Sequence, residues 1–220
     1  MTNNLQKMGG VAALIEAAAY VVGFGLYLTL LDSSDYVGPV RKVAFLVDNQ
    51  GIIYIGNLFI YVVFSAFLVV LALALYERLK ADSPALAQTA TAFGLIWAGL
   101  VIASGMIFNV GIGTVVDLYG KDPAQAASLW LAIGSVQEGL GGGNEIVGGL
   151  WVLLVSWAAL QGGGLPKALN YLGVVIGVAG ILTVVPTLDV LTDVFGLSQI
   201  VWFAWLGIVM LRSSQAPLSR

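Results

Sequence analysis

The sequence predicts an all-α integral membrane protein, a polytopic bundle of six transmembrane helices with a glycine-rich break before or within the fourth. Only 10% of the 220 residues are charged, whereas soluble domains carry about 25%. Apolar residues make up 59% of the chain, and the mean hydropathy is +0.95. The apolar runs are continuous and do not alternate with polar residues, which favours membrane-spanning helices over the strands of a barrel.

The charged residues define where the six spans begin and end. A helix needs about 20 apolar residues to cross a hydrocarbon core of about 30 Å. The predicted spans cover approximately residues 8–31, 51–76, 86–112, 144–161, 168–187 and 194–212. An additional apolar segment, 123–138, precedes the fourth span and begins with Asp122–Pro123, a pair typical of a helix N-terminus. No change in composition marks a domain boundary, so residues 1–220 are predicted to form a single membrane domain.

The loop after the first span contains apolar residues on both sides of Arg41 and Lys42. Gly38–Pro39 is a suitable start for a short helix. We therefore expect an interfacial segment over about residues 38–48, lying on the outer surface of the membrane. A lid over a cavity is the alternative interpretation.

The distribution of Lys and Arg predicts the orientation. With the N-terminus inside, six basic residues face the cytoplasm and three face outward. The inner residues are Lys7, Arg78, Lys80, Lys167, Arg212 and Arg220, and the outer residues are Arg41, Lys42 and Lys121. We therefore expect both termini on the cytoplasmic side of a bacterial inner membrane. Most aspartates fall on the outer side, where a negative field favours cations over anions.

Several residue types and motifs are missing from the chain. It contains no cysteine and no histidine, which excludes disulfides, thiolate zinc sites and the commonest general base. It has no glycine-rich phosphate loop, no nucleophile elbow and no lysine in mid-span. We therefore predict no catalytic residues, no metal, no cofactor and no nucleic-acid binding. The expected partners are membrane lipids and a small solute, and homo-oligomerisation is left open.

Three glutamates lie inside apolar runs: Glu16, Glu138 and Glu145. An ionisable side chain at mid-membrane costs about 2.5–3.5 kcal/mol and therefore needs an explanation. Glu16 lies about nine residues into the first span, and we consider two roles for it. It is either a proton-handling group or a neutral acid that joins two helices by a hydrogen bond.

Four of the five residues from Gly139 to Gly143 are glycine. An unbroken helix over 123–161 would be about 58 Å long, nearly twice the hydrocarbon thickness. A break would make Asn144 an N-cap and would place Glu145 in the first turn of the next helix. Discontinuous helices of this kind form substrate sites in transporters. The alternative is close packing through Gly139 and Gly143, which are spaced as GxxxG.

Polar side chains on other spans are predicted to lie at the level of Glu145. Asn57, Asn109 and Gln199 all fall in the outer half of their spans. We expect Glu145 to lie within hydrogen-bond reach of at least one of them, directly or through water. The predicted ligand-binding residues are Glu145, Glu138, Asn144, Asn57, Asn109 and Trp151.

A glycine-rich hairpin pattern occupies the C-terminal part of the chain. It comprises Gly141-Gly142-Gly143-Asn144-Glu145, Gly148-Gly149-Leu150-Trp151, Gly164-Leu165-Pro166-Lys167 and Tyr171-Leu172-Gly173. This pattern resembles a bacterial multi-pass family known as domain of unknown function 4386, mainly over residues 138–212. The resemblance implies a six-helix bacterial membrane protein and supplies no activity and no catalytic residues.

These features predict a small transporter, or a binding or sensing protein, for a small polar or cationic solute. A non-catalytic membrane scaffold or accessory subunit is one alternative, and a binder of lipid or another hydrophobic ligand is a second. An intramembrane enzyme, which would have to use carboxylates alone, is a third. A polar cavity that touches Glu145 would favour the solute-binding protein, whereas a dry bundle would favour the scaffold.

Overall fold

The computed structural model describes residues 2–32, 34–142, 145–188 and 190–213, and all regular secondary structure in these residues is helical. Five stretches are long and apolar enough to cross a membrane, judged by length and composition. They are Asn4–Leu30, Gln50–Leu79, Pro84–Tyr119, Pro123–Gly162 and Val190–Ser213. Lys167–Leu182 is a shorter apolar helix, so the count of six spans stays a prediction.

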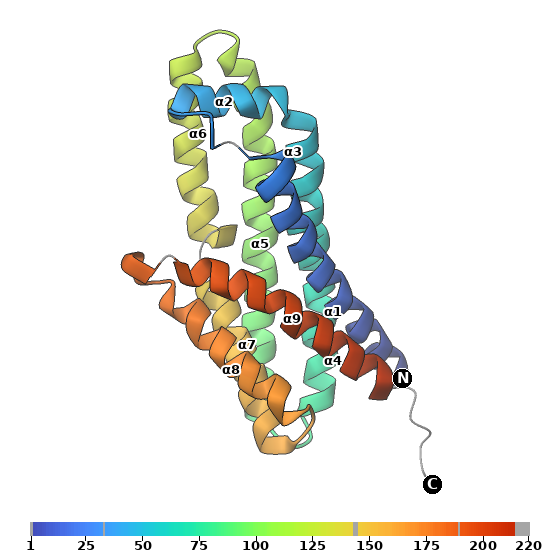
Figure 1. The fold of residues 1–220 in the computed structure, drawn as a ribbon. Helices are drawn as coiled ribbons and strands as arrows, with labels where there is room; N and C mark the ends of the chain where they lie inside the picture. Colours follow the sequence, from blue (N-terminus) through green and yellow to red (C-terminus); the bar gives the residue numbers. More distant parts are fainter. Residues whose placement is uncertain (1, 33, 143–144, 189, 214–220) are drawn as a thin grey trace.

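The helices form an elongated bundle, in which α5 is the longest (Figure 1). Among the described helices, α1, α3 and α6 continue directly into the π-helical turns η1, η2 and η3, and α4 begins directly from η2. In chain order the elements are α1 (Thr2–Gly25), η1 (Leu26–Leu30), α2 (Pro39–Asp48), α3 (Gln50–Asn57), η2 (Leu58–Val63), α4 (Phe64–Leu79), α5 (Pro84–Tyr119), α6 (Pro123–Gln137), η3 (Glu138–Gly142), α7 (Ile146–Gly162), α8 (Lys167–Leu182), the short 3₁₀ turn η4 (Pro186–Leu188) and α9 (Val190–Ser213).

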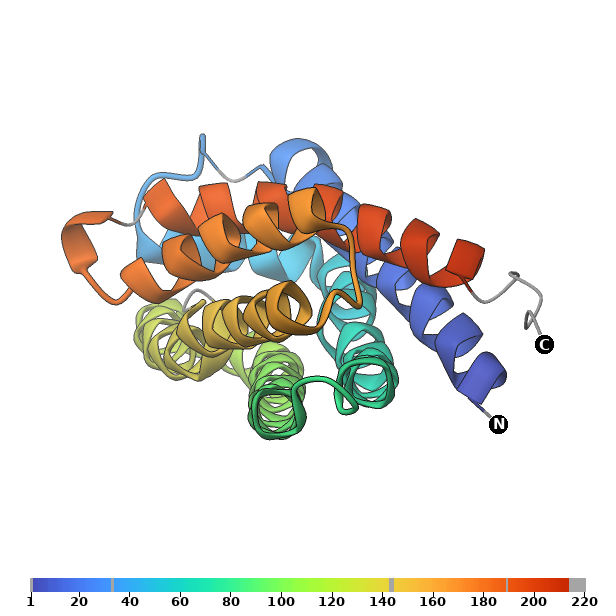
Figure 2. The same ribbon diagram turned by 90° about the horizontal axis from the view of Figure 1, so that it is seen from below.

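The bundle has two separate hydrophobic cores, one in each half of its length. The lower bundle consists of α1, α4, residues 84–101 of α5, α7, α8 and α9, and its core is built on Trp151, Trp202 and Phe203. The upper bundle consists of α2, α3, residues 108–119 of α5 and α6, and its core includes Val43 and Ile112. Seen along its long axis, the lower bundle has α8 and α9 on one side and α4 and α5 on the other (Figure 2).

The starts of two helices confirm local sequence predictions. α6 begins at Pro123, and the Asp122 carboxylate caps it by accepting the N–H groups of Ala124 at 3.1 Å and Gln125 at 3.0 Å. α2 begins at Pro39, after Gly38 with a φ of 95°. α2 lies across the upper bundle and packs on α5 and α6 (Figure 1). Its position at a membrane surface remains a prediction.

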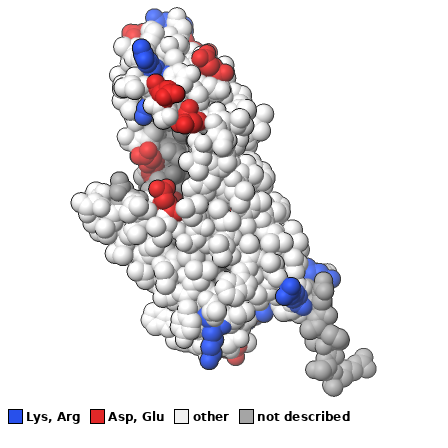
Figure 3. Space-filling view, viewed as in Figure 1, with Lys and Arg blue, Asp and Glu red and all other residues white. Residues whose placement is uncertain are grey.

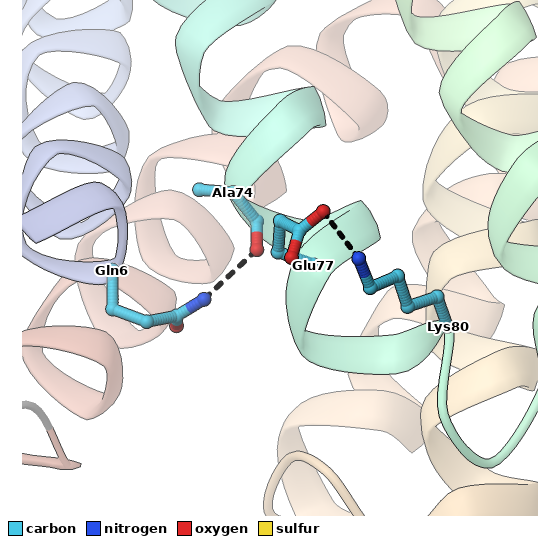
Figure 4. A network of polar contacts seen from close by, with 4 residues as sticks. All are labelled: Gln6, Ala74, Glu77 and Lys80. Atoms are coloured by element: carbon cyan, nitrogen blue, oxygen red, sulfur yellow. Dashed lines mark hydrogen bonds and ion pairs between the residues drawn. The ribbon is translucent and has the colours of Figure 1, made fainter. Parts of the chain in front are cut away.

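Arg78 ties together the end of the lower bundle at which α1 begins and α9 ends. Its guanidinium donates hydrogen bonds to Gly164 O at 2.8 Å, Gln6 Oε1 at 3.1 Å and Ser213 Oγ at 3.0 Å. Gln6 in turn donates to Ala74 O at 2.9 Å (Figure 4). These bonds connect α1, α4, the α7–α8 turn and α9. The neighbouring ion pair between Lys80 and Glu77, 2.6 Å long, lies at the surface and adds little.

α7 and α8 approach each other closely because glycines face each other between them. A Cβ atom added at Gly149 would lie 2.7 Å from Gly177 O and 2.8 Å from the backbone nitrogen of Ile181. Small residues at helix contacts are the usual means of tight association inside membranes, where apolar surfaces gain little by leaving lipid. Gly10 on α1 and Gly207 on α9 meet in the same way: a Cβ at Gly207 would lie 2.8 Å from Gly10 O.

Candidate ligand-binding pocket

A cavity of about 530 Å³ lies where the upper and lower bundles meet. Its volume falls within the range of about 300–1,000 Å³ typical of small-molecule sites. Side chains from α1, η1, η2, α4, α5, α6, η3, α9 and the start of α7 contribute to it. The lining residues are Ala19, Tyr20, Gly23, Phe24, Tyr27, Leu28, Ile60, Tyr61, Phe64, Trp97, Val101, Phe108, Gln137, Glu138, Gly141, Glu145 and Asp193.

Three π-helical turns of the described chain border this pocket. η1 contributes Leu28, η2 contributes Tyr61, and η3 contributes Glu138. Each π turn displaces the regular hydrogen-bond ladder of its helix, and such turns occur frequently at functional sites. The pocket therefore lies at the level where three helices depart from α geometry.

Gly141 has a backbone conformation that is not helical, with a φ of 137° and a ψ of 21°. L-residues with a side chain rarely adopt this φ, so glycine is required here. The predicted break over residues 139–143 includes Gly143, which lies outside the described residues, as does Asn144. At Gly139 an added Cβ would meet open space, so close helix packing does not require glycine at that position.

Acidic side chains give the pocket its charge. Glu145 is partly buried, whereas Glu138 and Asp193 are exposed. Figure 3 shows acidic side chains beside a hollow midway along the molecule. No Lys or Arg occurs among the described lining residues. Tyr20 and Tyr61 line the same pocket as Glu145. The pocket therefore has a negative potential, which attracts cations.

Hydrogen bonds fix the orientation of two tyrosines in the pocket wall. The hydroxyl of Tyr27 donates to Asn57 Oδ1 at 3.1 Å, and the hydroxyl of Tyr61 accepts a hydrogen bond from Gln137 Nε2 at 2.9 Å. Ser104 Oγ on α5 donates to the backbone oxygen of Gln137 at 2.9 Å, and this bond joins the end of α6 to α5. Both rings are therefore held in place, and their hydroxyls are already partly satisfied by the protein.

The predicted ligand-binding residues take different places around this pocket. Glu145 and Glu138 line it, and Asn57 lies behind Tyr27. Trp151 is completely buried against Trp97, with ring centroids 5.6 Å apart, and is not a lining residue. Asn109 belongs to the upper bundle, where its Nδ2 donates to Tyr54 O at 3.3 Å.

The described residues show no direct hydrogen bond between Glu145 and one of the three amides. Asn57 accepts from Tyr27 and Asn109 donates to Tyr54, whereas the remaining side-chain amide atom of each has no partner in the described part of the chain. Both amide atoms of Gln199 also lack a partner there. Asn57 contacts Tyr27 and Asn109 contacts Tyr54, so sharing a membrane depth was not enough to bond these two amides to Glu145. A contact through water stays a prediction.

Glu16 lies outside the pocket, one helical turn below Tyr20. Its side chain is 0% exposed, and within the described residues neither carboxylate oxygen has a hydrogen-bond partner. The predicted role as a hydrogen-bonding link between two helices is therefore not supported by a contact. A proton-handling role stays a prediction, and it would reach the pocket through Tyr20, which lies one turn further along α1 and lines the pocket.

Sequence reasoning did not select Asp193 or the aromatic lining residues as site residues. The aromatic lining residues are Tyr20, Phe24, Tyr27, Tyr61, Phe64, Trp97 and Phe108. A signal was present in the first span, because Glu16, Tyr20 and Tyr27 are spaced four and seven residues apart and so share one helix face. Asp193 is one of the aspartates predicted to lie on the outer side, and the structure places it in the first turn of α9. The π turns had no recognisable sequence signal.

Comparison with protein families places this chain in a wider group. A family model described as "Domain of unknown function (DUF4386)" matches residues 8–211, nearly the whole chain. The resemblance noted for residues 138–212 is thereby confirmed and extended to the N-terminal half. No curated protein and no solved structure matches the chain.

Proposed function

We propose that this chain, which belongs to the family described as a domain of unknown function (DUF4386), binds a small cationic solute in the pocket between its two bundles. One observation carries the proposal: the pocket holds three carboxylates and no basic side chain among its described lining residues. Glu138 and Asp193 would draw a cation to the entrance, and Glu145 would hold it further inside. An uncompensated group of acids inside a membrane protein is costly unless it serves a ligand.

A transport or sensing role would use the interrupted helix between α6 and α7. We propose that the helix breaks over Gly139–Gly143, and the non-helical conformation of Gly141 supports this. Irregular backbone at membrane depth is tolerated where it lines a cavity, and Gly141 lines the pocket. Broken helices at substrate sites allow the two halves of a transporter to move relative to each other.

The proposed topology has six spans, with both termini on the cytoplasmic side of the bacterial inner membrane. α8 is the shortest, and its 16 residues extend about 24 Å. The apolar turn that follows, Thr183–Leu188, would supply the rest of the crossing. The basic residues at the Arg78 end of the lower bundle outnumber those of the upper bundle, which supports a cytoplasmic lower end.

Single cysteines test the topology without background because the chain has none of its own. We expect Ser34→Cys to react with a membrane-impermeant maleimide in intact cells and Ala81→Cys to react only after lysis. Both positions are exposed, so neither label has to enter the protein. The reverse pattern of labelling would invert the assignment.

Calorimetric titration of the purified protein tests the function. The probes are potassium, spermidine and benzyltrimethylammonium, which cover inorganic, polyamine and quaternary cations. We expect at least one to bind, and Glu145→Gln to weaken that binding by about tenfold or more, equivalent to about 1.4 kcal/mol. Glu138→Gln and Asp193→Asn should each weaken it about two- to fivefold, because exposed charges interact through a high dielectric.

The matched control is Asp117→Asn, which removes an acid from the upper bundle away from the pocket. It should leave the affinity within about twofold of wild type. If none of the three probes binds, or if Glu145→Gln binds as tightly as wild type, the cationic-solute function is wrong.

A second candidate function is the binding of a lipid or another neutral hydrophobic ligand. Most of the lining is aromatic or aliphatic, and Leu28 at the rim is 72% exposed, which favours an apolar ligand that enters from the side. The carboxylates do not fit this role, because an apolar chain gains nothing from them. A pure scaffold role fits the glycine contacts of α7 and α8 but leaves the pocket unexplained.

A further inference from the structure

The aromatic side chains that line the pocket indicate the chemistry of the ligand more closely than the charge of the pocket does. Aromatic side chains form a continuous wall in which Tyr20 meets Phe64 edge to face at 5.7 Å between ring centroids. Phe64 in turn meets Trp97 edge to face at 5.5 Å. In an edge-to-face contact only one of the two rings has a face covered by its neighbour, so ring faces as well as ring edges belong to the wall. The faces of aromatic rings are negative and attract cations, most strongly when water is excluded.

Two of the tyrosine hydroxyls in the pocket wall already make a hydrogen bond within the protein. The hydroxyl of Tyr27 uses its hydrogen on Asn57, and that of Tyr61 accepts a hydrogen bond from Gln137 and keeps its own hydrogen. Beyond ring faces, the charged groups that remain for a ligand are the carboxylates of Glu145, Glu138 and Asp193. The pocket therefore offers a ligand mainly acceptor oxygens and few hydrogen-bond donors.

The same geometry disfavours a bare metal ion. Calcium takes six to eight oxygen ligands, and magnesium requires a near-octahedral shell. Within the described residues, no group of three or more acidic side chains lies close enough together to hold a metal ion. The acids are instead spread around a cavity of about 530 Å³, which is far larger than an ion. The cavity size therefore favours a molecule over an atom.

We infer that the ligand is an organic cation, a quaternary or tertiary ammonium group with apolar substituents, held by the ring faces of Tyr20, Tyr61, Phe64 and Trp97 and balanced by Glu145. The inference rests on the proposed function and specifies its substrate class. The substituents of the cation fill the aromatic wall, and the carboxylates compensate its charge without a directed hydrogen bond. Both a free organic cation and the choline headgroup of a lipid present this chemistry.

The first experiment compares a cation with its neutral carbon isostere. Purified full-length protein in a non-ionic detergent is titrated with benzyltrimethylammonium and with neopentylbenzene, which have the same shape. We expect the cation to bind at least ten times more tightly. Equal affinities would overturn the inference. If potassium or spermidine binds in a Glu145-dependent manner and benzyltrimethylammonium does not, the inference is wrong and the cationic-solute function stands.

Matched substitutions test the role of the rings. Tyr61→Phe keeps the ring and removes the hydroxyl, whereas Tyr61→Leu removes the ring. We expect Tyr61→Leu to lose at least fivefold more affinity for benzyltrimethylammonium than Tyr61→Phe does. Tyr27→Phe and Tyr27→Leu repeat the comparison at a second lining side chain, which is 43% exposed and is therefore less needed for packing. Tyr171→Leu on α8, remote from the pocket, is the control. Equal losses for Phe and Leu at both positions would contradict the assignment.

Lipid nanodiscs separate the two sources of the ammonium group. The protein is placed in phosphatidylcholine and, for comparison, in digalactosyldiacylglycerol, which is neutral and has no ammonium. Equal affinity for benzyltrimethylammonium in both supports a soluble organic cation, which is the source we expect. A tenfold loss confined to phosphatidylcholine would show that a choline headgroup occupies the pocket and would overturn the soluble ligand.

Discussion

Gly149→Ala is expected to destabilise the protein strongly, because it adds a methyl group between two helix backbones. The new Cβ would lie 2.7 Å from Gly177 O, 2.8 Å from Ile181 N and 2.9 Å from the carbonyl carbon of Gly180. Backbone atoms cannot rotate away as a flexible side chain can, so α7 and α8 must separate. Overpacking of this kind costs about 1–3 kcal/mol, and the loss of close contact along the helix pair adds to it.

The measurement is the midpoint of thermal unfolding in detergent, with Gly113→Ala and Gly134→Ala as controls. Both control glycines lie inside α-helices, and an added Cβ at either would meet open space. Alanine is the better helix former by up to about 1 kcal/mol, so the controls should be neutral or slightly stabilising. If Gly149→Ala has the same unfolding midpoint as the controls, the close contact between α7 and α8 is not as described.

Glu16→Met is expected to raise stability while it impairs function. The buried carboxyl group has no hydrogen-bond partner among the described residues, and burial without a partner costs about 1–3 kcal/mol. Methionine fills a similar volume with an apolar, flexible side chain. The unfolding midpoint should therefore increase. Glu16→Gln keeps a buried polar group and should not produce the gain, so it serves as the matched control.

The functional cost of Glu16→Met should appear in the pH dependence of cation binding. A carboxylate attracts a cation only in its ionised form, so the affinity of the wild type should fall as the buffer is made more acidic. If Glu16 handles protons linked to the pocket, its loss should flatten this dependence, and Glu145 would supply what remains. Lower stability of Glu16→Met together with an unchanged pH profile would assign Glu16 a structural role.

The sequence was most informative where a local signal has one structural outcome. Asp122–Pro123 specified the start of α6, and Gly38–Pro39 specified the start of α2. The spacing of charges located the long apolar helices, because charged residues are expensive in lipid. Position along a span indicates depth only. It does not indicate which neighbour a side chain faces, and for this reason Asn109 was grouped with Glu145 although it contacts Tyr54 on α3.

The aromatic part of the pocket could not be predicted because it depends on contacts between segments that are far apart in the sequence. Tyr61 packs against α5 because Gly105 leaves room: an added Cβ at Gly105 would lie 2.8 Å from the Cγ of Tyr61. That pairing joins residues 44 positions apart and requires α5 and η2 to be in register. The carboxylates were recognised because a charge in an apolar run is unusual, whereas a tyrosine or phenylalanine there is ordinary.

The two hydrophobic cores also determine how the molecule can bend. η1, η2 and η3 interrupt the regular α-helical ladder at the level of the pocket, where the cores meet. Among the described helices, α5 crosses this level as a single α-helix from Pro84 to Tyr119. The molecule therefore consists of two packed bundles connected by one continuous helix, and we expect it to bend most easily where the bundles meet. A motion that tilts one bundle against the other would change the width of the pocket before it disturbed either core.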